Sequence, residues 1–150
     1  MLLQRRTSER GTVWSAPGGL VRPGEDGDAA LVRSVRAAVG LRLAPGVVQH
    51  LVWVQTAGAS EPGGGPAAGT RDEVYLVRVP RFSPVRRPRA LLDDGGEEVA
   101  EVRWWSREDV AAATRAGERF SPRDLHDRLR PLLESASRGV IPSPVTIDGP

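Results

Sequence analysis

The pattern of hydrophobic and polar positions predicts strands and helices that alternate irregularly along the chain. Strands are expected where β-branched and aromatic residues gather, or where apolar and polar residues alternate. Helices are expected where apolar residues recur at a spacing of three or four. The predicted strands cover LLQRR near the start, TVWS at 12–15, and residues 47–56, 73–80 and 99–105.

The first predicted helix covers about 27–39. Asp26 or Asp28 can cap its start, because a side-chain carboxylate there accepts hydrogen bonds from unpaired backbone amides. Gly40 follows its last apolar position and is typical of a helix end. Between two of the strands, residues 57–72 lack periodicity and are rich in glycine, which predicts a mobile loop.

Two more helices are predicted in the last third of the chain. A short one follows Ser106, which can act as its cap. A longer one begins with a capping-box-like sequence at 121–124 and carries a stripe of leucines. Pro131 lies inside this helix and should interrupt and kink it. Residues 139–150 are expected to be extended or frayed.

These elements predict a single domain of the α/β or α+β class, an α/β/α sandwich with a mixed central sheet and helices on both faces. The length of 150 residues suits one domain. We assign the domain to 1–138 and an extended C-terminal tail to 139–150. The chain begins almost inside its first strand. Either the true start lies upstream of Met1, or the first strand is incomplete.

Charge and composition exclude several classes of function. The net charge is only +2, and the pI of about 10.2 is high because all 21 lysine-or-arginine positions are arginine and little else titrates above neutrality. An arginine cluster at Arg86, Arg87 and Arg89 reads as a solvated loop, so nucleic acid is not expected as a partner. The chain has no cysteine. No stretch approaches the roughly 18 apolar residues of a membrane span, and a cytoplasmic location is the default.

The loop before the first helix could handle phosphate groups. Residues 17–40 read PGGLVRPGEDGDAALVRSVRAAVG. Gly18 and Gly19 allow the backbone to approach a ligand closely, and the start of the following helix offers amides to an anion. Taken alone this pattern is weak, because many turns contain Pro-Gly-Gly.

The spacing of later residues makes this segment resemble the box of the Nudix hydrolase family, G-x5-E-x7-R-E-U-x-E-E-x-G-U, where U is aliphatic. Five residues separate Gly19 from Glu25, seven more precede Arg33, and Gly40 matches the late glycine. LLQRR, VWSAPGGLV, EVRWWSREDV and FSPRDLHDRLRPLL also resemble family segments. The resemblance implies a hydrolase of nucleoside diphosphates linked to another moiety, a small-molecule partner of that kind, and Mg²⁺ or Mn²⁺ as cofactor.

The departure from the family falls on the three acids of the box. Ser34, Ala37 and Ala38 stand where the family has glutamates. Positions spaced i, i+3 and i+4 share one helical face, where the glutamates jointly hold metal in the family. Alanine supplies no ligand and serine only a neutral one. We therefore expect hydrolysis to be lost or strongly impaired.

The resemblance leaves a short set of candidate site residues. Glu25 and Glu98 are the remaining candidates for catalysis, and with the Gly19 carbonyl they would form the metal set if any metal binds. Glu25 and Arg33 are favoured as a structural ion pair that holds the loop on the helix. An acid at Glu98 is also expected by chance, because the surrounding loop is charged.

Substrate binding is assigned to Arg5, Gly18 and Gly19. Arg5 and Arg6, at the end of a predicted edge strand, could reach a phosphate or be solvent-exposed. His50 and His126 are too few for a histidine metal cluster. Of Trp104 and Trp105, one must face away from the other, because neighbours in a strand point to opposite faces.

Three functions stay open at this stage. The first is a Nudix-fold protein that has lost efficient hydrolysis, needs no cofactor, and at most binds a nucleotide or another diphosphate compound. The second is an active Mg²⁺-dependent pyrophosphohydrolase with a rearranged metal site that uses Glu25 and Glu98. The third is a non-catalytic protein-interaction module that uses the arginine cluster or the 57–72 loop. The sequence does not fix the oligomeric state.

Overall fold

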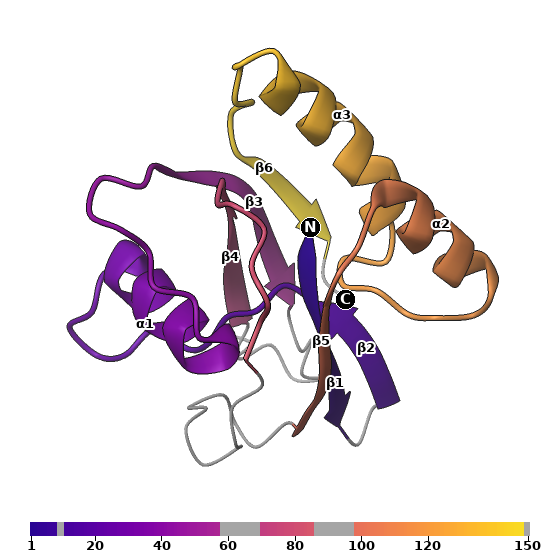
Figure 1. Ribbon diagram of the computed structural model, residues 1–150, viewed down its shortest axis with the longest axis horizontal. Coiled ribbons are helices and arrows are strands. Elements are labelled where there is room, and N and C mark those ends of the chain that lie inside the picture. Colours follow the sequence, from indigo (N-terminus) through magenta and orange to yellow (C-terminus); the bar gives the residue numbers. More distant parts are fainter. Residues whose placement is uncertain (9–10, 58–69, 86–97, 149–150) are drawn as a thin grey trace, which may run out of the picture.

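The computed structural model describes residues 1–8, 11–57, 70–85 and 98–148. Its elements follow the predicted order (Figure 1). The strands are β1 (Leu2–Ser8), β2 (Gly11–Ser15), β3 (Gln49–Ala57), β4 (Thr70–Val77), β5 (Glu98–Trp104) and β6 (Val145–Asp148). The helices are α1 (Gly27–Val39), α2 (Arg107–Arg115) and α3 (Leu125–Ser137).

The strands form two three-stranded sheets. One is antiparallel with the order β2-β1-β5, and the other has the order β4-β3-β6. In the second sheet β4 is antiparallel to β3, whereas β6 is parallel to it. The prediction that Arg5 and Arg6 end an edge strand is wrong, because β1 lies between β2 and β5 and bonds to both.

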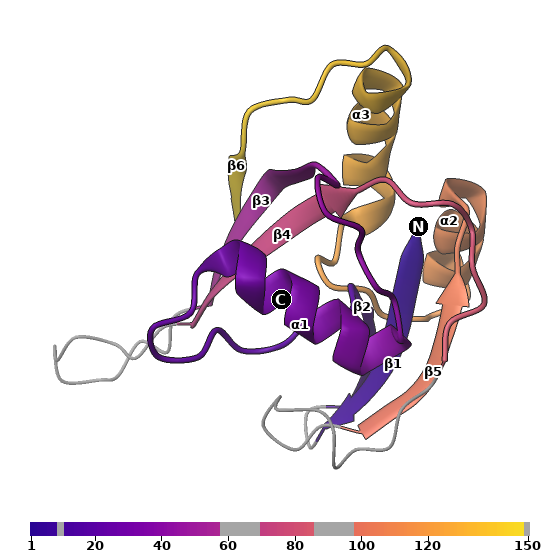
Figure 2. The same cartoon turned by 60° about the vertical axis from the view of Figure 1, so that its left-hand side comes forward.

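Helices cover the strands from two sides. α1 lies on one side, and α2 and α3 lie together on the other (Figures 1 and 2). The predicted fold class, a mixed α and β sandwich with helices on both faces, is confirmed. Within the described residues, no helix is long and apolar enough to cross a bilayer.

Helix ends show how closely local sequence sets these boundaries. α1 has the predicted bounds; its cap is Asp26, whose carboxylate accepts a hydrogen bond from the Ala29 amide at 2.7 Å. Gly40 ends the helix in the left-handed region at φ 75°, which a residue with a side chain rarely adopts. Ser106 caps α2 in a reciprocal capping box with Asp109.

α3 differs from the prediction at two points. Its cap residue, Asp124, makes no side-chain capping hydrogen bond. Pro131 does not interrupt the helix, which runs from Leu125 to Ser137. Proline removes one backbone hydrogen bond here, but the buried stripe on either side of it holds the helix to the core. That stripe comprises Leu125, Leu129, Leu132 and Ala136.

The loop and tail predictions were only partly right. β4 begins at Thr70, so the end of the predicted 57–72 loop is strand, and residues 58–69 lie outside the described part. In the predicted tail, Val145–Asp148 forms β6 and pairs with β3. Ile147 is 3% exposed in the core, so this part of the tail belongs to the sheet.

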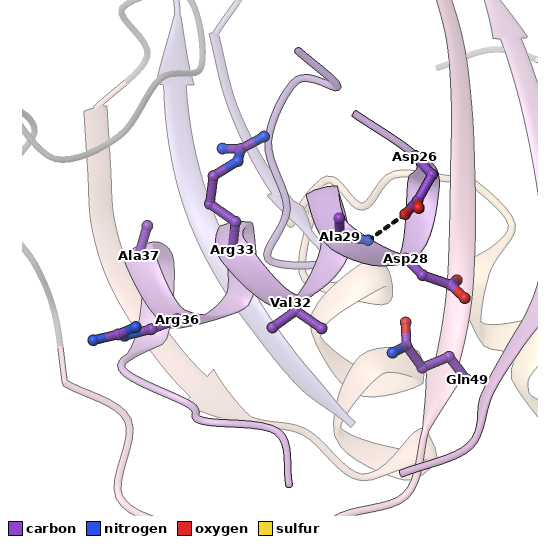
Figure 3. A pocket seen from close by; sticks show the side chains of 8 residues that line it. All are labelled: Asp26, Asp28, Ala29, Val32, Arg33, Arg36, Ala37 and Gln49. Carbon is purple, nitrogen blue, oxygen red and sulfur yellow. Dashed lines mark hydrogen bonds between the residues drawn. The ribbon is translucent and has the colours of Figure 1, made fainter. Parts of the chain in front are cut away.

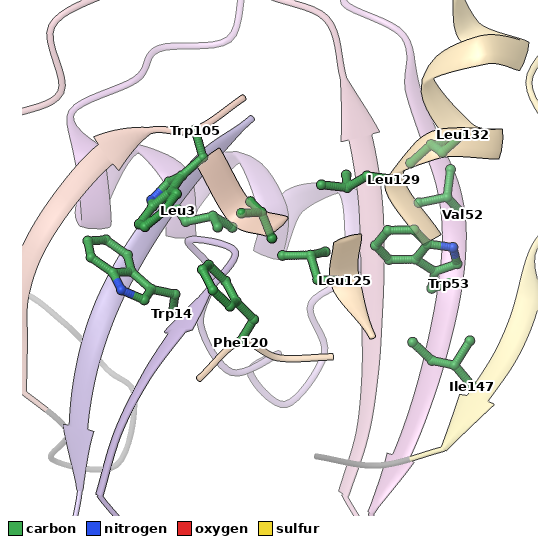
Figure 4. Close-up of a cluster of buried hydrophobic side chains, with 11 residues drawn as sticks. Leu3, Trp14, Val52, Trp53, Trp105, Phe120, Leu125, Leu129, Leu132 and Ile147 are labelled. Atoms are coloured by element: carbon green, nitrogen blue, oxygen red, sulfur yellow. The ribbon is translucent and has the colours of Figure 1, made fainter. Parts of the chain in front are cut away.

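The main core lies on the α2 and α3 side of the strands and is rich in aromatic residues. Trp105 makes edge-to-face contacts with Trp14 and Phe120, at centroid distances of 4.8 and 5.2 Å (Figure 4). Leu125 and Leu129 of α3 extend this cluster towards β3. Aromatic side chains bury large apolar areas, so this side supplies much of the stability.

A second apolar cluster packs α1 against the β2-β1-β5 sheet. Val35, Ala38 and Val39 pack with Leu2 of β1 and Val102 of β5, among others. The two neighbouring tryptophans divide between the two sides, as predicted. Trp105 belongs to the main core, whereas Trp104 donates a hydrogen bond from its indole to the Phe82 carbonyl at 2.9 Å. Phe82 packs against the α1 cluster.

Candidate functional site

The glycine-rich loop lies directly on α1. A Cβ atom built on Gly19 would be 2.8 Å from the Ser34 hydroxyl oxygen, a separation that real side chains do not show. A Cβ atom built on Gly18 would meet no atom within 4 Å apart from its chain neighbours. A side chain at position 19 would therefore require the Ser34 hydroxyl to move, whereas the space beside Gly18 is open.

Glu25 and Arg33 join the far end of this loop to the helix. The Arg33 guanidinium donates to both carboxylate oxygens of Glu25, at 2.8 and 2.7 Å, and also to the Leu20 carbonyl. The Arg22 amide donates to Glu25 as well, at 3.0 Å. The hydrogen bonds from Arg33 and then from Arg22 lower the pKa of Glu25 to about 2. This carboxylate is therefore ionised at neutral pH and fully engaged.

The three positions that carry acids in the Nudix box are not equivalent here. Ser34 is 4% exposed and Ala38 is 2% exposed, both facing the strands, whereas Ala37 is half-buried and lines a groove. Ala38 packs in the apolar α1 cluster. Two of the three positions therefore face the interior, where a carboxylate would lose its hydration.

Beneath α1 lies a set of buried polar groups that sequence reasoning missed. Gln4 is fully buried, and neither atom of its amide has a hydrogen-bond partner. Its strand neighbours are Ser15 and Val102, and the Ser15 and Ser34 hydroxyls also lack partners. Val102 packs against α1, so Gln4 faces the same helix. The only signal in the sequence was a glutamine inside a strand.

Arg5 and the glycine loop lie on opposite faces of the β2-β1-β5 sheet. Arg5 pairs across the strands with Trp14, and its guanidinium lies 5.7 Å from the Trp14 ring and 3.7 Å from Glu101. Trp14 belongs to the main core, away from α1. The neighbouring Arg6 shares the register of Val13 and lies on the α1 side.

For the remaining candidate residues the structure describes few contacts. Glu98 begins β5 opposite Thr7, and its side chain lies outside the described part, as does the Arg86–Arg89 cluster. His50 lies in β3, and His126 in α3 contacts Asp127 at 3.1 Å.

The start of α1 approaches β4 closely. A Cβ on Gly27 would be 2.7 Å from the Tyr75 hydroxyl, so a side chain there would require Tyr75 to shift. That hydroxyl donates to Glu73 at 2.8 Å. Burial, reinforced by Glu73, raises the pKa of Tyr75 to about 12. Sequence reasoning missed this contact, because it depends on where β4 lies relative to α1.

An open groove of about 770 Å³ follows the outer face of α1. Val32 lies between Arg36 on one side and Asp28 and Gln49 on the other (Figure 3). Asp26, Ala29, Arg33 and Ala37 complete the lining. The groove is therefore apolar at its centre and oppositely charged at its two ends.

Comparison with known families agrees with this loop and helix. The family model for the NUDIX domain matches residues 1–128. The chain belongs to the Nudix family. No curated protein and no solved structure gave a significant match to it.

Nudix domains in general use divalent metals such as Mg²⁺ or Mn²⁺, but the described residues do not fit such an ion. Magnesium prefers several charged oxygen ligands in octahedral geometry. No group of three or more histidine, aspartate or glutamate side chains within the described ranges could hold a metal. The buried groups under α1 are a neutral amide and two hydroxyls, and both oxygens of Glu25 are engaged by Arg33.

The start of α1 is also a poor place for an anion. Asp26 already caps it, and Asp28 lies in its first turn. These carboxylates occupy the region where the helix dipole would attract a phosphate. The sequence-based expectation that the helix start offers its amides to an anion therefore finds no support in this geometry.

Proposed function

We propose that this Nudix domain has lost metal-dependent hydrolysis and retains binding of a nucleotide or a related diphosphate compound. The observation that carries the proposal is the state of the box helix. Ser34 and Ala38 are buried without any carboxylate, and Glu25 is held by Arg33. Without a bound cation, little offsets the charge that develops on the phosphoryl oxygens during hydrolysis.

Binding of the diphosphate is assigned to the glycine loop. Gly18 has open space beside it, and Gly19 is exposed, so backbone groups of both residues can contact a ligand. The sequence alone suggests Arg5 as a further binding residue. Arg6 has the stronger claim, because it lies on the α1 side of its sheet whereas Arg5 contacts Trp14.

The test combines calorimetric titration with a turnover assay on the same protein sample. Mg²⁺ and Mn²⁺ are titrated alone, and a panel of nucleoside diphosphate compounds is titrated with and without metal. We expect a nucleotide to bind with an affinity that metal does not change, and the metal alone not to bind. Phosphate release at about 1 s⁻¹ or faster with Mg²⁺, which is ordinary for enzymes, would refute the proposal.

A substitution at Glu98 tests the alternative function, an active hydrolase with a rearranged metal site. If Glu98 served as ligand or base, Glu98→Gln would abolish Mg²⁺-dependent turnover. Glu101→Gln is the matched control, since Glu101 lies on the same strand and contacts Arg5 instead. Our proposal expects no turnover in the parent protein or in either variant.

A further inference from the structure

The outer face of α1 carries a pattern that complements itself. Asp28, Val32 and Arg36 follow one another at intervals of four residues, so they lie along one side of the helix. Asp28 and Arg36 are each about 6 Å along the axis from Val32, at roughly 1.5 Å per residue. The acid and the base are therefore equidistant from an apolar centre.

These groups are available for contact. Val32 is 37% exposed, and both Asp28 and Arg36 are exposed. Within the ranges that the structure describes, no ion pair involves either charged residue. Ala29, also exposed on this face, is small enough to let another helix approach closely. Figure 3 shows the two charged side chains projecting on either side of Val32.

We propose that the groove on the outer face of α1 is the dimer interface for a second copy of this chain. In a two-fold pair with antiparallel α1 helices, Val32 meets Val32 of the partner subunit. Asp28 then lies opposite Arg36 of the partner subunit, and Arg36 lies opposite the partner subunit's Asp28. A two-fold axis generates both ion pairs at once, as an interface between identical surfaces requires.

The self-complementary charges favour a second copy over other occupants. A small anion would engage only the Arg36 end and a small cation only the Asp28 end, whereas a copy related by a two-fold axis satisfies both ends at once. Val48, next to the groove residue Gln49 in sequence, is 64% exposed and adds apolar surface. This inference goes beyond the proposed function and does not depend on it.

Sedimentation velocity at several protein concentrations tests the interface by charge reversal. The parent chain should form dimers. Asp28→Arg or Arg36→Asp alone would place like charges opposite one another, and we expect the dimer dissociation constant to rise about tenfold or more. Asp127→Arg and Arg42→Asp are matched controls, because each makes the same charge change at an exposed site outside the groove and should leave the dimer intact.

Mixing separates this interface from a folding defect. Each reversal places a charge at the less favourable end of the α1 dipole, so circular dichroism must first show that both variants are folded. The two single variants, mixed in equal amounts, should form heterodimers, since the two arginines of one chain then face the two aspartates of the other. The double variant D28R/R36D should dimerise by itself. A monomeric parent chain, or a dimer that both single reversals leave unchanged, would overturn the proposal.

Discussion

The two faces of the β2-β1-β5 sheet bury different kinds of side chain. On the α2 and α3 side, Trp105 packs edge to face against Trp14 and Phe120, and among these three rings the Trp105 indole nitrogen is buried without a hydrogen-bond partner. On the α1 side, Gln4 and Ser34 are buried with unpartnered polar atoms. Packed aromatic groups stabilise a fold, whereas buried polar groups without partners destabilise it. The α2 and α3 side of this sheet is therefore mainly aromatic and apolar, whereas the α1 side buries a neutral amide and a hydroxyl beneath the box helix.

The largest expected effect breaks the aromatic side. Trp105→Ala should lower the free energy of unfolding by about 3–5 kcal/mol, because it leaves a cavity beside Trp14 and Phe120. Trp104→Ala, one residue earlier on the other side, should cost less, because Trp104 is only half-buried. Urea unfolding measures both. Equal losses would contradict the division of the core between the two sides.

A second comparison uses two neighbouring box positions. Ala38→Glu should destabilise the protein by about 3 kcal/mol or more, because the new carboxylate would be buried without a partner. Ala37→Glu should lower stability by much less, about 1 kcal/mol or below, since Ala37 is half-buried and lines the open groove, where the carboxylate keeps contact with water. The melting temperatures of the two variants, measured with and without Mg²⁺, provide the comparison. Tolerance of glutamate at 38 without metal would show that the helix face is not closed.

The contrast between the sides can be sharpened on a single strand. Gln4→Met removes an unpartnered amide from the α1 side and should raise the free energy of unfolding by about 1–2 kcal/mol. Leu3→Gln introduces such an amide on the opposite side, in the main core, and should lower it by a similar amount or more. Chemical denaturation of both variants provides the measurement. A loss of stability in Gln4→Met would mean that the Gln4 amide makes hydrogen bonds after all.

The smallest expected effect concerns the ion pair between Glu25 and Arg33, which joins the glycine loop to α1. It should be visible in the pH dependence of the free energy of unfolding. The pKa of Glu25 falls from an ordinary 4.5 to about 2, so its ion pair stabilises the fold fully above pH 4.5 and loses this contribution as the pH falls towards 2. Glu25→Gln should be less stable at neutral pH and should lack this part of the acid dependence. Glu134→Gln, on exposed α3 surface, is the control. The free energy of unfolding is measured at several pH values between 2 and 7 for the parent and the variant. If it falls by the same amount in both as the pH is lowered, the ion pair does not stabilise the fold.

The sequence by itself determined the local elements and the family. Helix α1 starts and ends where Asp26 and Gly40 stand, because capping and left-handed backbone are properties of single residues. The strands likewise follow their β-branched and alternating residues, and the spacing of the box residues was enough to indicate the Nudix family. The lack of box acids was also visible at this level.

Only the tertiary structure decided which of these residues meet. It placed β1 between two strands, separated Arg5 from the glycine loop, and brought β6 from the predicted tail into a sheet. It also distinguished Ala37 from Ala38, and it kept α3 intact through Pro131. These outcomes depend on contacts between residues far apart in sequence, whose energies outweigh local preferences and leave no local pattern to detect.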